Sequence, residues 1–347
     1  MGLGVFSFSI LAASAFASGA DFCDAPYKAI CENAEQTQAA RDSRYGERRI
    51  DIVNNALRSH RLPAELFEDK IRGLEITVVL ANIQRVKQLL GDAIKEQHQI
   101  GRLTFFECLQ MLAKIETVEV WTSFRLNRHF SDDSILKQKQ IEYNEFCGTD
   151  GMADNAFAGS ENGKPYIFLC PGGLLRAAVS TDDRSHDFLN LLQTMAHEFG
   201  HHIDFGDFEK TYQDMNACYA KHYSRRLQYG DSPYDYVASH VEKTGNLRFV
   251  RAVQNYKVRT HSREITADFW AVQTVKQYLA TVAQEDRLQS LKEAYEGLCT
   301  GIDVGKHPDG TYRIGLVLGS DHGIRRLMGC TDYQNKVSCA LNGAELY

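Results

Sequence analysis

Nine cysteines are the feature that most constrains this fold, because each disulfide would hold two segments with their Cα atoms about 6 Å apart. The cysteines stand at positions 23, 31, 108, 147, 170, 218, 299, 330 and 339. In an exported chain such a number indicates disulfides, with one thiol left unpaired or paired elsewhere. The short spacings favour Cys23 with Cys31 and Cys330 with Cys339, although spacing does not fix connectivity. The sequence has no CxxC motif, which disfavours a cysteine-based metal site.

The first twenty residues predict export. They carry no charged side chain, include the apolar residues 5–16, and end in two small-x-small patterns, at 15–17 and 18–20. A basic n-region is missing, so a membrane anchor or a buried N-terminal segment are the alternatives to a cleaved signal peptide at 1–20. The stretch is short and Ser-rich for a membrane span. We therefore expect a periplasmic or secreted protein with no integral membrane segment after signal cleavage.

Length and charge limit the size of the hydrophobic core and the kinds of binding partner to expect. A chain of 347 residues with 44% hydrophobic residues can bury one large core or two modest ones. The net charge is −6, and no long Lys/Arg run is present. This balance argues against electrostatic capture of nucleic acid or acidic membranes, so no nucleic-acid partner is expected.

Hydrophobic periodicity predicts an α+β protein that is predominantly helical. Residues 48–130 repeat apolar side chains at helical spacing, and helices are also expected at about 187–203, 262–279 and 286–299. Residues 146–173 contain short β-prone pieces that predict a hairpin or two strands. The segment from 206 to 260 is expected to be rich in loops. The composition changes at 131–146, so we expect a helical N-terminal region at 21–145 and a second unit at 146–347.

The segment His197-Glu198-Phe199-Gly200-His201 carries the residues best suited to chemistry. Helical residues four apart share a face, so His197 and His201 can present two imidazoles to one point. Glu198 could reach a metal-bound water without binding the metal, like the general base of HExxH metallopeptidases. A solvated polar face that happens to hold two histidines is the alternative. The apolar stripe lies on the opposite side of this helix: Phe188, Leu192, Met195, Phe199 and Ile203.

A third zinc ligand is offered by residues 262–268, since catalytic zinc commonly takes a further His or Glu. Glu264 and Asp268 lie four apart on a predicted helix that Ser262 would cap. Two bare carboxylates at this spacing repel each other, and a cation between the helices would remove that cost. We expect Glu264 to bind zinc and Asp268 to accept the N–H of a ligating histidine. An acidic first turn favoured by the helix dipole is the alternative for Glu264.

Together, His197-Glu198-x-x-His201 and Glu264-x-x-x-Asp268 resemble the gluzincin metallopeptidases. Residues 155–158, 167–169 and 173–175 look like the substrate-binding edge strand and the following strand of the neprilysin-like and CAAX-protease/HtpX-like families. His307-Pro308 with Arg313-Ile314 looks like the HPxxxxRI segment of the HtpX-like family, and residues 312–339 are similar to the neprilysin C-terminus. The resemblance covers about residues 150–347 and leaves the choice between the two branches open.

The resemblance implies a zincin-like catalytic domain at 146–347, with a small sheet and an HExxH helix. It implies one Zn²⁺ ion held by His197, His201 and Glu264, with Glu198 as general base. The N-terminal helical region carries no such resemblance.

The same resemblance implies roles for residues around the metal. His307 would donate to the oxyanion, and Arg313 would hold a backbone carbonyl of the substrate. A surface ion pair is the alternative for Arg313. His322 is a rival oxyanion donor, and His202 is expected to be a bystander. An extended peptide would add to the sheet edge at Asn155, Ala156 and Phe157.

These observations predict an exported zinc metalloendopeptidase that acts on peptides or unfolded proteins through a zinc-activated water. The main alternative is a catalytically inactive, zinc-bearing module that binds a peptide or protein in the same groove. A structural helical protein with a coincidental HExxH segment is a third interpretation. It leaves the pair Glu264 and Asp268, and the pair His307 and Arg313, without an explanation.

Overall fold

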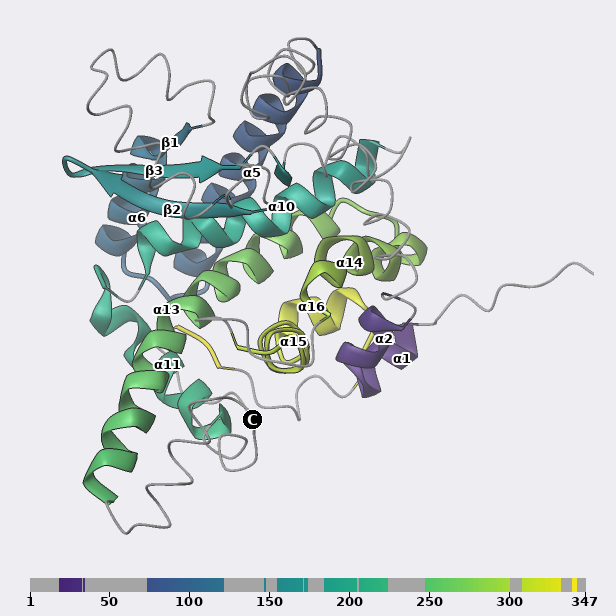
Figure 1. Ribbon diagram of the computed structural model, residues 1–347. Coiled ribbons are helices and arrows are strands. Elements are labelled where there is room, and N and C mark those ends of the chain that lie inside the picture. Colours follow the sequence, from purple (N-terminus) through teal and green to yellow (C-terminus); the bar gives the residue numbers. More distant parts are fainter. Residues whose placement is uncertain are drawn as a thin grey trace, which may run out of the picture.

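The computed structural model describes residues 19–32, 34, 74–121, 147, 155–170, 172–173, 184–204, 206–223, 247–299, 308–331 and 339–341. These residues are mostly helical and contain one small mixed sheet, which confirms the expected α+β class (Figure 1). Most of the predicted leader, at 1–18, and most of the predicted boundary, at 131–146, lie outside the described residues.

Three long helices form the centre of the molecule. They are α5 (Leu74–Gln99), α10 (Arg184–Gly200) and α13 (Leu247–Leu279), and each packs against the other two. The predicted apolar stripe of α10 is buried along its whole length, which explains why this helix occupies the centre. Side chains of α5 and α10 belong to one hydrophobic core, so the two predicted regions are packed together.

Shorter helices surround this centre. Helix α6 (Phe105–Thr117) begins with a capping box, in which the Thr104 side chain accepts from the Glu107 amide and the Glu107 side chain accepts from the Thr104 amide. The remaining helical segments are α1 (Gly19–Asp24), α2 (Pro26–Cys31), η1 (His201–Ile203), α11 (Glu209–Tyr223), η2 (Gln284–Asp286), α14 (Arg287–Tyr295), η3 (Glu296–Leu298), α15 (Gly310–Tyr312), the π-helical η4 (Arg313–Leu318) and α16 (His322–Leu327).

The sheet has the order β1-β3-β2, formed by Glu119–Trp121, Lys164–Leu169 and Ala156–Glu161. Strands β2 and β3 form an antiparallel hairpin, one of the two arrangements expected for residues 146–173, and β1 runs parallel to β3. The hairpin turns at Asn162-Gly163, where both residues have positive φ, as a tight hairpin turn requires. Among the described strands, β2 therefore lies at an edge of the sheet.

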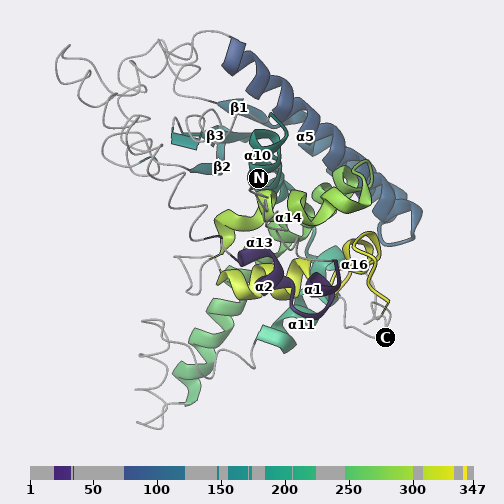
Figure 2. The ribbon, with the colours of Figure 1, turned by 90° about the vertical axis from the view of Figure 1, so that its right-hand side faces the viewer.

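The sheet lies along one side of α10 (Figures 1 and 2). Alternate residues of β3 point to opposite faces, so Ile167 and Leu169 enter the main core beside α10. The other face carries Tyr166, which stacks on Trp121 with ring centroids 4.2 Å apart. Strand β3 is thus fixed by apolar packing on both faces.

Four disulfides are present, and their pairing corrects the sequence expectation. Cys23 binds Cys330 and Cys31 binds Cys299, so neither predicted local pair is formed. The expectation failed because short sequence spacing takes no account of tertiary packing, which places α2 against α14 and η4. The other two disulfides join Cys147 to Cys170 and Cys218 to Cys339. Four disulfides are typical of an oxidising compartment.

The sequence placed the start of α13 too late. This helix begins at Leu247, inside the segment expected to be loop-rich, and α11 also lies there. Ser262 is therefore an interior helical residue, and its carbonyl accepts a hydrogen bond from the Thr266 hydroxyl. Residues 247–261 contain no Gly or Pro that would end a helix, and Phe249, Val253 and Tyr256 lie at helical spacing, so the sequence itself permitted the earlier start.

Among the described residues, no helix is both long and apolar enough to cross a bilayer.

Cys108 provides a test of the disulfide pattern. It is the one free cysteine, and its side chain is buried, which raises the pKa of the thiol. We expect the native protein to react slowly with a thiol reagent and the unfolded, non-reduced protein to expose one thiol per chain. A Cys108→Ser variant should expose none. More than one thiol per unfolded wild-type chain would contradict the four-disulfide arrangement.

Candidate metal centre

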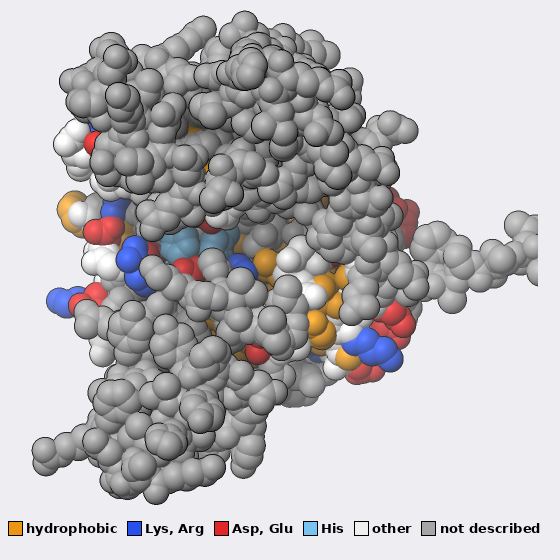
Figure 3. Space-filling view, viewed as in Figure 1, with side chains coloured by type: hydrophobic (Ala, Val, Ile, Leu, Met, Phe, Trp, Pro, Cys, Tyr) orange, Lys and Arg blue, Asp and Glu red, His pale blue; other side chains and the backbone are white. Residues whose placement is uncertain are grey.

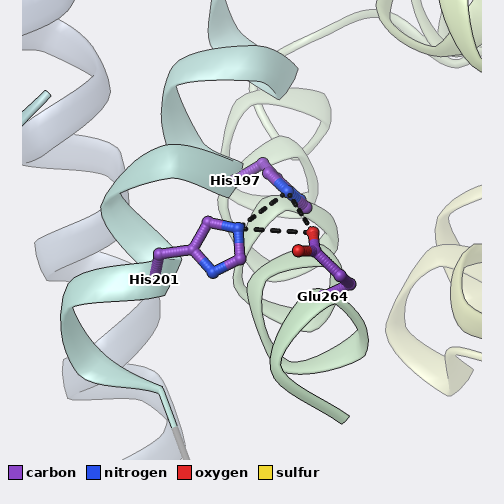
Figure 4. A group of neighbouring side chains, drawn as sticks. All are labelled: His197, His201 and Glu264. Atoms are coloured by element: carbon purple, nitrogen blue, oxygen red, sulfur yellow. Dashed lines mark hydrogen bonds and ion pairs between the residues drawn. The ribbon is translucent and has the colours of Figure 1, made fainter. Parts of the chain in front are cut away.

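Three side chains, two from the continuous α10–η1 segment and one from α13, converge on one point (Figure 4). His197 lies in the last turn of α10, His201 is the first residue of η1, and Glu264 belongs to α13. The two Nε2 atoms are 3.2 Å apart. Glu264 Oε2 is 3.3 Å from His197 Nε2 and 3.4 Å from His201 Nε2.

This near-equilateral triangle has the dimensions of a shared metal site. Ligand atoms on one tetrahedral zinc ion lie about 3.3–3.4 Å apart, because Zn–N and Zn–O bonds are about 2.0–2.1 Å long. The three measured distances match that spacing. The group of His197, His201 and Glu264 could therefore hold a metal ion.

Burial decides between the alternatives left open by the sequence. His197 and Glu264 are buried, and the side chain of His201 is only 15% exposed, so the solvated-face interpretation is wrong. Glu264 lies far inside α13, so it is not part of an acidic first turn. In the space-filling view, histidine side chains lie in a hollow of this face, bordered by charged side chains (Figure 3).

Gly200 brings the two ligand-bearing helices together. A Cβ at this position would lie 2.8 Å from the Ala267 Cα, closer than side-chain carbons approach backbone. Gly200 has ordinary helical dihedral angles, so the residue type is required by the close approach and not by the backbone conformation. His197 precedes Gly200 by three residues on α10. Glu264 precedes Ala267 by three residues on α13. The close contact therefore lies one helical turn from both ligands.

Asp268 is the residue that orients the first ligand. Its Oδ1 accepts from His197 Nδ1 at 2.9 Å, which leaves Nε2 of the same ring facing Glu264. Such a carboxylate contact fixes the histidine tautomer. Arg313 holds Asp268 in turn, with Nε 2.8 Å from Oδ2 and Nη2 2.5 Å from Oδ1. The geometry is that of a bidentate pair.

The Asp268–Arg313 pair is buried on both sides, so a surface ion pair does not describe Arg313. Burial opposes ionisation of Asp268, yet Arg313 and His197 hold the pKa of this carboxyl well below its usual range. Arg313 begins the π-helical η4, a type of turn often found at functional sites. The ion pair thus joins η4 to α13 beside the ligand triad.

The carboxylates around the triad favour positive charge. Burial alone would lower the pKa of His201, but its contacts with Asp204 and Glu264 raise that pKa to about 10. Asp268 likewise raises the pKa of His197 against the effect of burial. A site that stabilises a cation on its imidazoles offers the same electrostatic stabilisation to a metal ion.

Asp204 is a site residue that the sequence interpretation missed. It is 1% exposed, and its Oδ2 lies 3.8 Å from His201 Nδ1 and 2.7 Å from Arg263 Nε. Its position three residues after His201, one helical turn away, was the available signal. Asp204 thus links His201 to Arg263, the residue directly before Glu264.

The other predicted residues are placed as follows. Asn155 directly precedes β2, and its carbonyl accepts from the Cys170 amide at 3.0 Å. Ala156 and Phe157 are the first residues of β2, and the Phe157 ring packs 5.3 Å from that of Phe168. His307 lies outside the described residues. His322 is the first residue of α16.

His202 has a structural contact. Burial lowers its pKa to about 4, and its Nε2–H donates to the Tyr166 carbonyl in β3 at 3.0 Å. The residue therefore ties η1 to the sheet.

Comparisons with protein-family models, curated proteins and solved structures found no match to this chain.

Gly200→Ala tests whether close helix packing builds the triad. We expect the free energy of unfolding to fall by about 1–3 kcal/mol, because the new methyl group meets the α13 backbone. Metal affinity, measured by competition with a chelator, should fall with it as the ligands separate. Gly91→Ala is the matched control, since its Cβ would lie an ordinary 3.6 Å from Leu112. That helical substitution should leave metal affinity unchanged and stabilise the protein slightly.

Asp268→Asn tests the orienting contact. The amide keeps the shape but leaves Arg313 as an uncompensated buried charge, so unfolding free energy should fall by about 3–5 kcal/mol. Metal affinity should fall about 10- to 100-fold because the orientation of His197 is lost. Asp207→Asn is the control, since Asp207 is an exposed carboxylate paired with Lys114. An equal loss in both variants would show that Asp268 has no special role.

Proposed function

We propose that this protein is an exported zinc-dependent metalloendopeptidase of the gluzincin type, acting on peptides or unfolded proteins. The observation that carries the proposal is the metal-sized triangle of His197, His201 and Glu264, with Glu198 between the two histidines. The buried contact of His197 with Asp268 supports a site organised for a metal.

The donor set favours zinc. Two imidazole nitrogens and one carboxylate oxygen suit Zn²⁺, whereas Ca²⁺ and Mg²⁺ take mainly oxygen ligands. Three protein ligands leave a fourth position for water or substrate, as in catalytic zinc sites. Bound there, zinc would act as a Lewis acid that acidifies water and polarises a carbonyl.

The protein's own residues would handle the proton and the substrate. Glu198, buried beside the ligands, would take a proton from the attacking water and deliver it to the leaving amine. Asp268 would keep Nδ1 of His197 protonated, so that Nε2 remains available as a ligand. His307 remains the proposed donor to the oxyanion.

Arg313 can combine two roles in this proposal. Its Nε and Nη2 bind Asp268, which leaves Nη1 for the proposed contact with a substrate carbonyl. Strand β2, with Asn155, Ala156 and Phe157 at its start, would add the substrate to its edge through main-chain hydrogen bonds. The zincin-like domain at 146–347 and a cleaved signal peptide at 1–20 belong to the same proposal. The four disulfides support export.

The test compares wild type with Glu198→Gln. We expect one zinc ion per chain in both proteins by elemental analysis, and cleavage of a peptide library only by the wild type. The amide should lower kcat/KM by at least about 100-fold, because it cannot accept the proton. Chelation should abolish wild-type cleavage, and added Zn²⁺ should restore it.

Two outcomes would contradict the proposal in different ways. Zinc binding by wild type without cleavage of any peptide or unfolded protein, together with capture of one partner by both forms, would favour the non-catalytic binding module. Cleavage by Glu198→Gln at the wild-type rate would show that another group acts as the base.

A further inference from the structure

We propose that Arg263 binds a carboxylate of the substrate, so that the enzyme prefers peptides with an anionic group two or three residues from the scissile bond. The anion is either an acidic side chain or the C-terminal carboxylate of the peptide. This inference rests on the proposed peptidase function and names the substrate class for the same site.

Arg263 is held rigidly at one end. Its Nε donates to Asp204 Oδ2 at 2.7 Å, and Asp204 Oδ1 accepts from the Gly206 amide at 2.8 Å. Because Asp204 is almost completely buried, its carboxylate is a fixed support for the guanidinium. The arginine has therefore lost much of its rotamer freedom before any ligand binds, which reduces the entropic cost of recognition.

The other end of the guanidinium is open. The side chain of Arg263 is 60% exposed, and Nε is its only atom with a partner in the part of the chain that the structure describes. The two terminal nitrogens form the planar fork that binds a carboxylate through two parallel hydrogen bonds. A lysine has no such fork, and Lys114 on the neighbouring α6 is already paired with Asp207.

Distance connects this fork with the metal centre. Arg263 Nε lies 2.7 Å from Asp204 Oδ2, and the same oxygen lies 3.8 Å from His201 Nδ1. These two distances limit how far Arg263 can be from the triad. Together with the width of an imidazole ring, they place Arg263 Nε within about 9 Å of the His201 ligand atom. An extended peptide advances about 3.3 Å per residue, so the carboxylate would belong to the second or third residue from the cleaved bond.

Charge makes the selection specific for anions. Two of the carboxylates near His201 face cationic or imidazole groups: Asp204 binds Arg263, and Glu264 faces both histidines. An anionic peptide group would be stabilised by the open fork, and a cationic group there would be repelled. Arg263 would thus act on substrate choice and not on the chemical step.

The test uses zinc-loaded protein and peptides that differ at one position. That position, two or three residues from the cleaved bond on either side, carries Glu or Gln, and each peptide has a free or an amidated C-terminus. Wild type should cleave the best anionic peptide with kcat/KM about three- to tenfold above its neutral match. Loss of this preference on amidation identifies the C-terminal carboxylate, and persistence identifies the side chain.

Arg263→Gln should bring the anionic-to-neutral ratio close to one, while Lys114→Gln, which also removes one positive charge near the site, should retain the wild-type ratio. Equal loss on both peptides in Arg263→Gln would overturn the inference, since a purely structural role lowers both rates together. An equal rate on both peptides in wild type would also overturn it.

A binding measurement separates this inference from the proposed function. Fluorescence anisotropy with zinc-loaded Glu198→Gln reports the same anionic preference without cleavage. If wild type cuts nothing but Glu198→Gln binds anionic peptides better and Arg263→Gln removes the difference, the peptidase proposal fails and Arg263 recognition stands. If neither protein distinguishes the peptides, the recognition fails.

Discussion

The site depends on a buried carboxylate that serves two partners. Asp268 accepts from His197 and binds Arg313, so a change in any of these three side chains leaves a buried charge or donor without compensation. Together these three side chains join α10, α13 and η4, which are distant in sequence. Burying these charged groups costs desolvation free energy, and the contacts offset that cost only if all three partners are present. The packing of α10, α13 and η4 around them should therefore form cooperatively.

Much of the candidate site could be predicted because its signals are local. The spacing of His197 and His201, and of Glu264 and Asp268, follows directly from helix geometry, and the α10 stripe and the β2–β3 hairpin were predicted from hydrophobic and turn patterns. The disulfides and the role of Gly200 could not be derived in this way, because both depend on which helices touch. Asp204 was overlooked because its partners lie on two different elements.

The boundaries of α13 show a further limit of sequence reasoning. The N-terminal half of this helix carries Phe249, Val253 and Tyr256 at helical spacing and no Gly or Pro, so the signal for a longer helix was present but was not used. Its start matters for chemistry as well as for fold. An interior helical position holds Glu264 more rigidly than a first turn would, since hydrogen bonds on both sides restrain its backbone.

Two of the disulfides have a consequence for resistance to proteolysis. Cys23–Cys330 and Cys31–Cys299 join the beginning of the described chain to its end. A single backbone cut anywhere between residues 31 and 299 leaves two fragments that remain linked by both bridges. Such a nicked molecule can keep α10 and α13 packed against each other. These two long-range disulfides would therefore hold the folded molecule together after a single proteolytic cleavage.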